Sequence, residues 1–178
     1  MTSPGVRGVE HIGITVPDLD AATRFFVDAL EAVPVYDMSD IGEDVFAGAD
    51  FTPSLGVPQG TRLRNVRFLR FPHGPTLELF HYEPPDQRPA HRPSDIGVQH
   101  IALFVDDIDA AGARILAAGG ELLEGPSPMV FKEAGDGNRW WYTRTPWGTT
   151  IELVSYRTMA YEATTGERRY TPPPIPPA

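Results

Sequence analysis

A segment of fifteen residues occurs twice in this chain, and this repetition constrains the fold more than any other feature. The first copy covers residues 8–22 and the second 97–111, an offset of 89 residues without a gap, with nine identical positions. A second pair of matching segments, 72–82 and 146–156, closes each half. A repeat of this length indicates two copies of one supersecondary unit, neither of which buries its apolar face well alone.

Both halves show the same order of expected elements. A β-branched, alternating run predicts a strand, an Asp then acts as a helix N-cap, an apolar stripe predicts a helix, and further alternating runs predict strands. In the first half these are a strand over 9–16, a helix over 19–32, a short strand over 45–47, and strands over 62–71 and 76–82. In the second half they are a strand over 98–105, a helix over 108–118, and strands over 121–123, 139–144 and 149–156.

The pattern divides the chain into two modules with a linker and a tail. A segment with four prolines and no apolar period separates the halves, and the periodicity is lost after the last strand. The expected boundaries are a first module at 7–82, a Pro-rich linker at 83–95, a second module at 96–156, and a C-terminal extension with a Pro-rich tail at 157–178. Because half-units with open sheet edges pair readily, we expect a homodimer.

Charge and composition exclude several classes of function. The formal net charge of −9 gives no basic surface for nucleic acid, and the chain has no cysteine for a disulfide, a thiolate metal site or a nucleophile. No apolar run is long enough to span a membrane, and the N-terminus has no apolar segment typical of a signal peptide. We therefore expect a cytoplasmic protein that acts on a small molecule, without nucleic-acid or membrane partners.

Each half opens with a histidine and ends with a glutamate inside apolar runs. His11 and His100 lie in the opening strands, and Glu78 and Glu152 are flanked by Leu or Ile in the closing strands. An ordinary sheet with one solvated face also shows this alternation. However, the same pair recurs in both halves, and two imidazoles with two carboxylates suit a divalent ion such as Fe, Mn, Co, Ni or Zn. The sequence therefore predicts a metal site.

The order of these motifs resembles the vicinal oxygen chelate superfamily, which includes glyoxalase I, methylmalonyl-CoA epimerase, extradiol dioxygenases and bleomycin-resistance proteins. The resemblance covers roughly residues 7–156 and rests on His-Ile-Gly-Ile-Thr-Val-Pro-Asp-Leu, on Gln-His-Ile-Ala-Leu-Phe-Val-Asp-Asp-Ile, and on the two Gly-x-Thr-[Leu/Ile]-Glu-Leu strands. Each motif alone is a weak signal, whereas all four in this order are a strong one. The resemblance implies an α+β fold in which two paired βαβββ modules form a cup-shaped, partly open barrel around a metal.

By position, the resemblance implies that His11, Glu78, His100 and Glu152 are the four metal ligands of the glyoxalase and epimerase branch. The metal would chelate adjacent oxygens of a small-molecule substrate as a Lewis acid. Glu78 and Glu152 would then be catalytic, moving a proton in an isomerisation, epimerisation or lyase reaction through an enolate-like intermediate.

Two other functions stay open. The resemblance also includes the extradiol branch of the superfamily, whose metal site has two histidines and one carboxylate. The equivalent of Glu78 is not a ligand there, so the first alternative is an Fe(II) ring-cleavage dioxygenase. The second is a non-catalytic drug-binding protein, which the complete ligand set disfavours. An Fe(II) protein that air bleaches would favour the dioxygenase, whereas Ni, Co, Mn or Zn would favour proton transfer.

The candidate substrate-binding residues are cationic or aromatic. Arg64, Arg67 and Arg139 offer positive charge for the carboxylates of a substrate, whereas Phe131 and Trp141 suit a planar or hydrophobic one. Both kinds of residue also have ordinary structural uses, in a solvated strand face and in core packing. Methylmalonyl-CoA epimerases resemble this chain, but their additional catalytic carboxylate would fall in the strand of Arg64 and Arg67, which disfavours a CoA ester as substrate.

Overall fold

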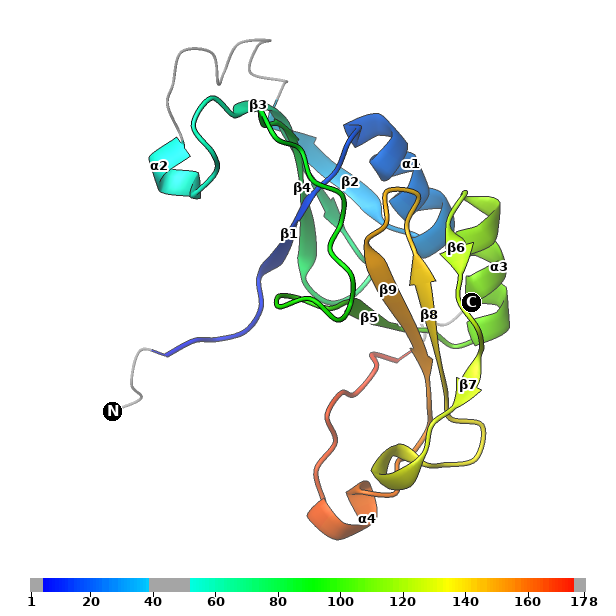
Figure 1. Cartoon of the computed structure of the whole chain (residues 1–178). Coiled ribbons are helices and arrows are strands. Elements are labelled where there is room, and N and C mark those ends of the chain that lie inside the picture. The colour runs from blue at the N-terminus through cyan, green and yellow to red at the C-terminus, as the bar shows by residue number, and fades with distance from the viewer. Residues whose placement is uncertain (1–4, 39–51, 175–178) are drawn as a thin grey trace. The chain divides into compact units, whose positions relative to one another are not determined.

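The computed structural model of the chain describes residues 5–38 and 52–174 (Figure 1). The chain divides into two compact units, Met1–Arg88 and Pro89–Ala178. Each unit contains one sheet and one long helix, so the predicted α+β class with two βαβββ modules is confirmed. No helix within the described ranges is both long and apolar enough to cross a membrane.

The sheet of the first unit has the strand order β1-β4-β3-β2, with β1 parallel to β4 and the other neighbours antiparallel. Its helix α1 packs against β2, β3 and β4. The elements are β1 (His11–Thr15), α1 (Leu19–Leu30), β2 (Val33–Asp37), the short α2 (Thr52–Leu55), β3 (Arg62–Arg70) and β4 (Thr76–Glu83).

The start of α1 follows the sequence prediction and its end does not. Asp18 caps the helix by accepting a hydrogen bond of 2.7 Å from the backbone N–H of Ala21. The helix predicted over 19–32 ends at Leu30, because Glu31 takes a left-handed conformation with φ of 58°. Its backbone N–H then bonds back to the last turn, which is a common way for a helix to end.

Strand β2 was not predicted, because its proline indicates a break in regular structure. Pro34 is tolerated because, among the strands that the structure describes, β2 lies at the edge of the sheet and has β3 as its one neighbour. A shift of register between Pro34 and Tyr36 accommodates the irregularity. The strand predicted over 45–47 lies outside the described residues.

The sheet of the second unit repeats this plan with the order β5-β9-β8-β6, and β7 also pairs with β8. Strand β5 runs parallel to β9, as β1 does to β4. The elements are β5 (Ile101–Phe104), α3 (Ile108–Ala117), β6 (Glu121–Leu122), β7 (Ser127–Pro128), the 3-10 helix η2 (Phe131–Glu133), β8 (Arg139–Arg144), β9 (Thr150–Ser155) and α4 (Glu162–Thr165). The position of β2 is thus taken by two short strands.

Alternation in β9 defines the two faces of this sheet. Ile151 and Leu153 are 2% and 0% exposed and lie on the face that α3 covers (Figure 1). Glu152, Val154 and Tyr156 therefore point to the other face. Val154 and Tyr156 are nevertheless buried there, because they cluster with Met129 from the loop after β7 and with Met159 from the segment after β9. Part of the C-terminal extension is therefore folded onto the second module.

Candidate active site

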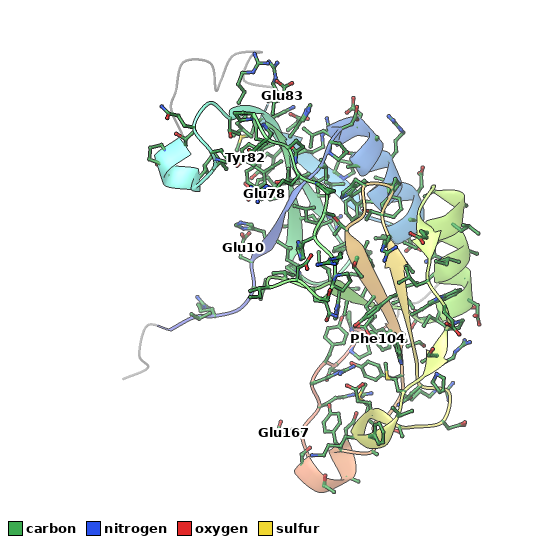
Figure 2. The ribbon with its side chains drawn as sticks, in the orientation of Figure 1. Glu10, Glu78, Tyr82, Glu83, Phe104 and Glu167 are labelled. Carbon is green, nitrogen blue, oxygen red and sulfur yellow. The ribbon has the colours of Figure 1, made fainter. Side chains whose placement is uncertain are left out.

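The first module places His11 opposite Glu78. His11 begins β1, and the parallel register aligns it with Thr76 and aligns Gly13 with Glu78 on β4. The two side chains meet, with 3.2 Å between His11 Nε2 and Glu78 Oε2. Glu78 is labelled in Figure 2. The structure therefore brings together the two predicted ligands of this module.

The second module repeats the arrangement. His100 comes directly before β5, and Ala102 aligns with Glu152 on β9. His100 Nε2 lies 2.9 Å from Glu152 Oε2. The predicted pair of this module is also brought together, with the same ring nitrogen facing the carboxylate.

The other ring nitrogen of each histidine faces the side chain of the preceding residue. Nδ1 of His11 contacts the carboxylate of Glu10, and Nδ1 of His100 lies 3.1 Å from Oε1 of Gln99. Both partners accept hydrogen bonds, so Nδ1 carries the proton in the neutral ring and Nε2 keeps a lone pair. That lone pair faces a carboxylate oxygen, and two acceptors in contact require a proton or a cation between them.

Burial supports the same conclusion for the carboxylates. The side chains of Glu78 and Glu152 are each 18% exposed, whereas His11 and His100 are 43% and 23% exposed. A carboxylate that is largely removed from water needs compensation by charge or hydrogen bonds. The pairs therefore offer the nitrogen and oxygen donors that suit a divalent cation. Among the residues that the structure describes, no three His, Asp or Glu side chains form a group of this kind.

Electrostatic shifts identify two further charged residues near Glu152. Burial is the main cause that raises the pKa of Glu152, whereas His100 and then Arg169 lower it and Glu133 raises it. In the first module the pKa of His11 is raised, chiefly by the hydrogen bond with Glu10. Arg169 and Glu133 therefore lie within electrostatic range of Glu152, although neither belongs to the predicted ligand set.

A tyrosine accompanies each pair. Burial, and then the charge of Glu78, raise the pKa of Tyr82, which lies on the same face of β4 (Figure 2). Burial, and then the charge of Glu152, raise the pKa of Tyr142, whose ring centroid lies 5.1 Å from that of His100. Both phenols therefore stay protonated at neutral pH and can donate a hydrogen bond.

Arg64 and Arg67, two predicted substrate-binding residues, are held in ion pairs of the first module. Arg64 Nη2 lies 2.8 Å from Glu83 Oε2 at the end of β4. Arg67 is 19% exposed and bridges β3 to α1 and β2 through contacts of 2.9 Å with Asp20 and 2.6 Å with Asp37. Arg67 is therefore on the face that α1 covers, opposite the face of Glu78.

Arg139 and Trp141 lie on the α3 side of the second sheet. Arg139 pairs with Asp109 of α3 at 2.8 Å, and the indole of Trp141 packs against Gly112 in the same helix. Their neighbour in β8, Tyr142, aligns with Glu152 and faces the other way. The structure thus places Arg139 and Trp141 on the face opposite Glu152, away from the predicted ligands of this module.

Phe131, the last predicted substrate-binding residue, is at the start of η2. The residue is 88% exposed and its φ of 56° is left-handed, which is rare for a bulky residue. A hydrogen bond of 2.8 Å from the backbone N–H of Tyr161 to the carbonyl of Lys132 ties this loop to the C-terminal extension.

Several residues at the two pairs were not predicted. Glu10 and Gln99 occupy the same position in the repeat, directly before each histidine, so the alignment of the two halves contained a signal for them. Arg169 and Glu133 had no such signal. They are far apart in the sequence, one lies in the extension, and neither belongs to a repeated motif.

A sequence model of the Glyoxalase/Bleomycin resistance protein/Dioxygenase superfamily matches residues 8–153. The match covers most of the chain, including both His–Glu pairs, and so the chain belongs to this superfamily. The resemblance that the two repeated motifs indicated is thereby confirmed.

The chain is similar to two curated proteins, and the name of one of them states a reaction. The chain is 37% identical over 171 residues to a 2-epi-5-epi-valiolone epimerase from Actinomyces sp., with 95% of this chain and 91% of the relative covered. It is 28% identical over 111 residues to the uncharacterised protein YaeR of Escherichia coli K12, with 62% and 70% covered. The similarity to the epimerase supports an isomerase-type member of the superfamily.

Solved structures share the fold at lower identity. A glyoxalase family protein from Bacillus cereus superposes with a TM-score of 0.64 at 20% identity, covering 87% of this chain and 97% of that protein. A mutant of the fosfomycin resistance protein FosX from Listeria monocytogenes, in complex with Mn(II) and 1S,2S-dihydroxypropylphosphonic acid, superposes with a TM-score of 0.59 at 20% identity, covering 86% and 95%.

Proposed function

We propose that the chain is a metal-dependent epimerase in which His11, Glu78, His100 and Glu152 hold one divalent ion. The observation that carries this proposal is the repeated pair, in which a histidine Nε2 faces a largely buried carboxylate in both modules. The two pairs together supply two nitrogens and two oxygens, a set suited to Mn, Fe, Co, Ni or Zn. The family, and the Mn(II) of the FosX complex, support a metal in this place.

The proposed substrate is a hydroxylated ketone. The relative that is 37% identical is an epimerase, and the ending of its substrate name denotes hydroxyl and ketone groups. Inversion at a carbon beside a carbonyl needs only the removal and return of one proton. This chemistry requires neither oxygen nor a redox cofactor, and it fits a site whose reactive side chains are carboxylates.

Glu78 and Glu152 are proposed to transfer the proton. The bound metal would act as a Lewis acid that lowers the cost of negative charge on the substrate carbonyl oxygen. One glutamate, ionised at the start of the turnover, would accept the proton as the C–H bond beside the carbonyl breaks. The other, protonated at the start, would give its proton to the opposite face as the new C–H bond forms, and proton exchange with water would then restore the starting state of both. The phenols of Tyr82 and Tyr142 are placed to donate hydrogen bonds to oxygens of the substrate.

The metal is tested by elemental analysis of purified variants. We expect close to one ion per chain in the wild type, loss of most of it in His100→Ala and Glu152→Ala, and no change in the control His73→Ala. His73 is exposed and lies in the turn between β3 and β4. Full metal content in both His100→Ala and Glu152→Ala would refute the proposed ligand set.

The reaction is tested with 2-epi-5-epi-valiolone in deuterated water. We expect the epimerised product to carry deuterium at the inverted carbon, without oxygen uptake, and Glu78→Gln to retain metal while losing most turnover. Oxygen uptake with a catechol, together with full activity of Glu78→Gln, would instead establish the dioxygenase. Tight binding of a hydrophobic drug without turnover of any ketone would establish the binding protein.

A further inference from the structure

The C-terminal extension returns to the face of the second sheet that carries Glu152. After α4 the chain runs back toward the sheet, through Glu167, toward the side of Phe104 (Figures 1 and 2). The Tyr170 ring centroid lies 5.9 Å from that of Phe104 on β5, and Arg168 donates a hydrogen bond to the carbonyl of Arg157. Since Phe104 and Glu152 point to the same face, the extension borders the surface of the proposed active site.

Arg169 is the polar centre of this contact. Its guanidinium carbon lies 5.5 Å from the centroid of the Tyr156 ring, and its Nη1 forms an ion pair with Glu133 from η2. Its backbone N–H donates a hydrogen bond of 2.8 Å to the hydroxyl of Tyr161. Three segments distant in sequence, the η2 loop, the end of β9 and the extension, therefore meet at one side chain.

The cluster of Arg169 and Glu133 lies within reach of a ligand held at Glu152. Glu152 and Tyr156 are four residues apart on one face of the same chain segment, which corresponds to about 13 Å along an extended strand. The guanidinium carbon of Arg169 lies 5.5 Å from the centroid of the Tyr156 ring, and the guanidinium is paired with Glu133. A molecule of monosaccharide size can therefore contact Glu152 with one end and the cluster with the other.

The chemistry of the cluster suits hydroxyl groups better than an anion. Glu133 already balances the charge of Arg169, so a free carboxylate or phosphate would meet both an attractive and a repulsive partner. The guanidinium offers several N–H donors in a plane, and the carboxylate offers acceptor oxygens. The side chains of Arg169 and Glu133 are 45% and 44% exposed, respectively, so their polar atoms are accessible to a ligand. Neighbouring hydroxyls, each a donor and an acceptor, complement this pair.

We propose that Arg169 and Glu133 bind the hydroxyl groups of the substrate, and that the C-terminal extension is thereby part of the substrate site. This inference rests on the proposed function, which places the reacting end of the substrate at Glu152. The alignment with the valiolone epimerase leaves out only 5% of this chain, so it runs well past residue 153 and into the extension. The family model, in contrast, ends before the extension begins.

The test compares Arg169→Met, Arg169→Lys and Glu133→Gln with two controls, Arg157→Met and Glu124→Gln, whose side chains are exposed. Binding of 2-epi-5-epi-valiolone is measured by calorimetry on the full chain with its metal, and turnover is measured in parallel. We expect Arg169→Met to weaken binding by about tenfold or more, Arg169→Lys to recover part of the loss, and the controls to bind like the wild type.

A second ligand separates a specific role from a general loss of structure. We expect 2-hydroxycyclohexanone, which lacks the additional hydroxyls, to bind wild type and Arg169→Met equally. Unchanged valiolone binding in both Arg169→Met and Glu133→Gln overturns this inference even if the wild type epimerises the ketone. Loss of valiolone binding in Arg169→Met, with no epimerisation by the wild type, overturns the proposed reaction and leaves the hydroxyl subsite standing. Should Arg169→Met fold poorly, Arg169→Lys and Glu133→Gln decide the question alone.

Discussion

Gly112 and Trp141 provide a sharp test of the assignment of Trp141 to the packed face of the second sheet. A Cβ added at Gly112 would lie 2.5 Å from Cζ3 of the Trp141 indole, which is shorter than the distances that non-bonded carbon atoms adopt. The indole cannot easily move away. Its Nε1–H donates a bond of 2.7 Å to the carbonyl of Leu123, and a Cβ at Gly125 would lie 2.6 Å from its Cδ1.

The expected cost of Gly112→Ala follows from two opposing effects. Replacing Gly by Ala inside a helix stabilises by about 1 kcal/mol, whereas forcing a methyl group into a packed contact costs about 1–3 kcal/mol. Because Trp141 is held on two sides, we place the cost at the upper end. The net destabilisation is then about 2 kcal/mol, or a fall in Tm of about 4–8 °C for a chain of this length.

A double-mutant cycle shows whether the indole is the cause. Trp141→Phe removes the outer ring atoms that the new methyl group would meet, and by itself should destabilise through the lost hydrogen bond and the cavity. In the Trp141→Phe background, Gly112→Ala should be neutral or stabilising, a coupling of about 2 kcal/mol. Calorimetric Tm values of the four proteins give the result. A higher Tm for Gly112→Ala in the wild-type background would refute the packing described for Trp141.

Three further predictions concern metal affinity, acid stability and assembly. Glu10→Gln should weaken metal binding by about tenfold in a competition assay with a chelator, because a carboxylate at Nδ1 orients the ring and makes Nε2 a stronger ligand; equal affinity would exclude this role. The bond from the Ala21 N–H lowers the pKa of Asp18 from 3.8, so its stabilisation is present above that value and is lost as the pH falls below it. An asparagine can also cap the helix but has no proton to gain in this range, so between about pH 6 and about pH 2.5 the Tm of Asp18→Asn should fall less than the Tm of the wild type. An equal fall in Tm for both proteins would contradict this. We also propose a homodimer, and a monomer mass by light scattering at micromolar concentration would reject it.

The sequence predicted the repeated elements well because their signals are local. The opening strand, the Asp cap and the helix of each module were placed from alternation, capping and an apolar stripe, and these are properties of adjacent residues. The strand β2 and the helix α4 were missed. Pro34 made β2 look like a break in the sequence. On an edge strand, however, a proline is tolerated, because its missing N–H would be needed only by a further strand paired on that side. Helix α4 spans only Glu162–Thr165, too short for a periodic pattern.

The candidate site was predictable only in part, for a related reason. His11 and Glu78 are far apart in sequence, but the repeat marks them twice, and each module does bring its own pair together. The orientation of Trp141 had no such marker, because Trp140, Trp141 and Tyr142 are consecutive and the aromatic character of the run does not show which face is covered. Only the pairing of β8 with β9 and the contact with α3 decide this.

The two modules are similar in their proposed ligands and in the tyrosine beside each pair, and they differ in the charge of the neighbouring groups. The histidine of the first module contacts a carboxylate, Glu10, and that of the second contacts a neutral amide, Gln99. Within residues 5–38 and 52–174, the second module alone carries an extension that folds back onto its own sheet, where Arg169 lies beside Tyr156. An epimerase that inverts one carbon needs two similar carboxylates for the two faces of the substrate, but it must also bind that substrate in a single orientation. The duplication accounts for the first requirement. If the proposed reaction holds, the different charges around Glu78 and Glu152 would supply the asymmetry that the second requires, and the hydroxyl groups bound at Arg169 would fix which carbon of the substrate reacts.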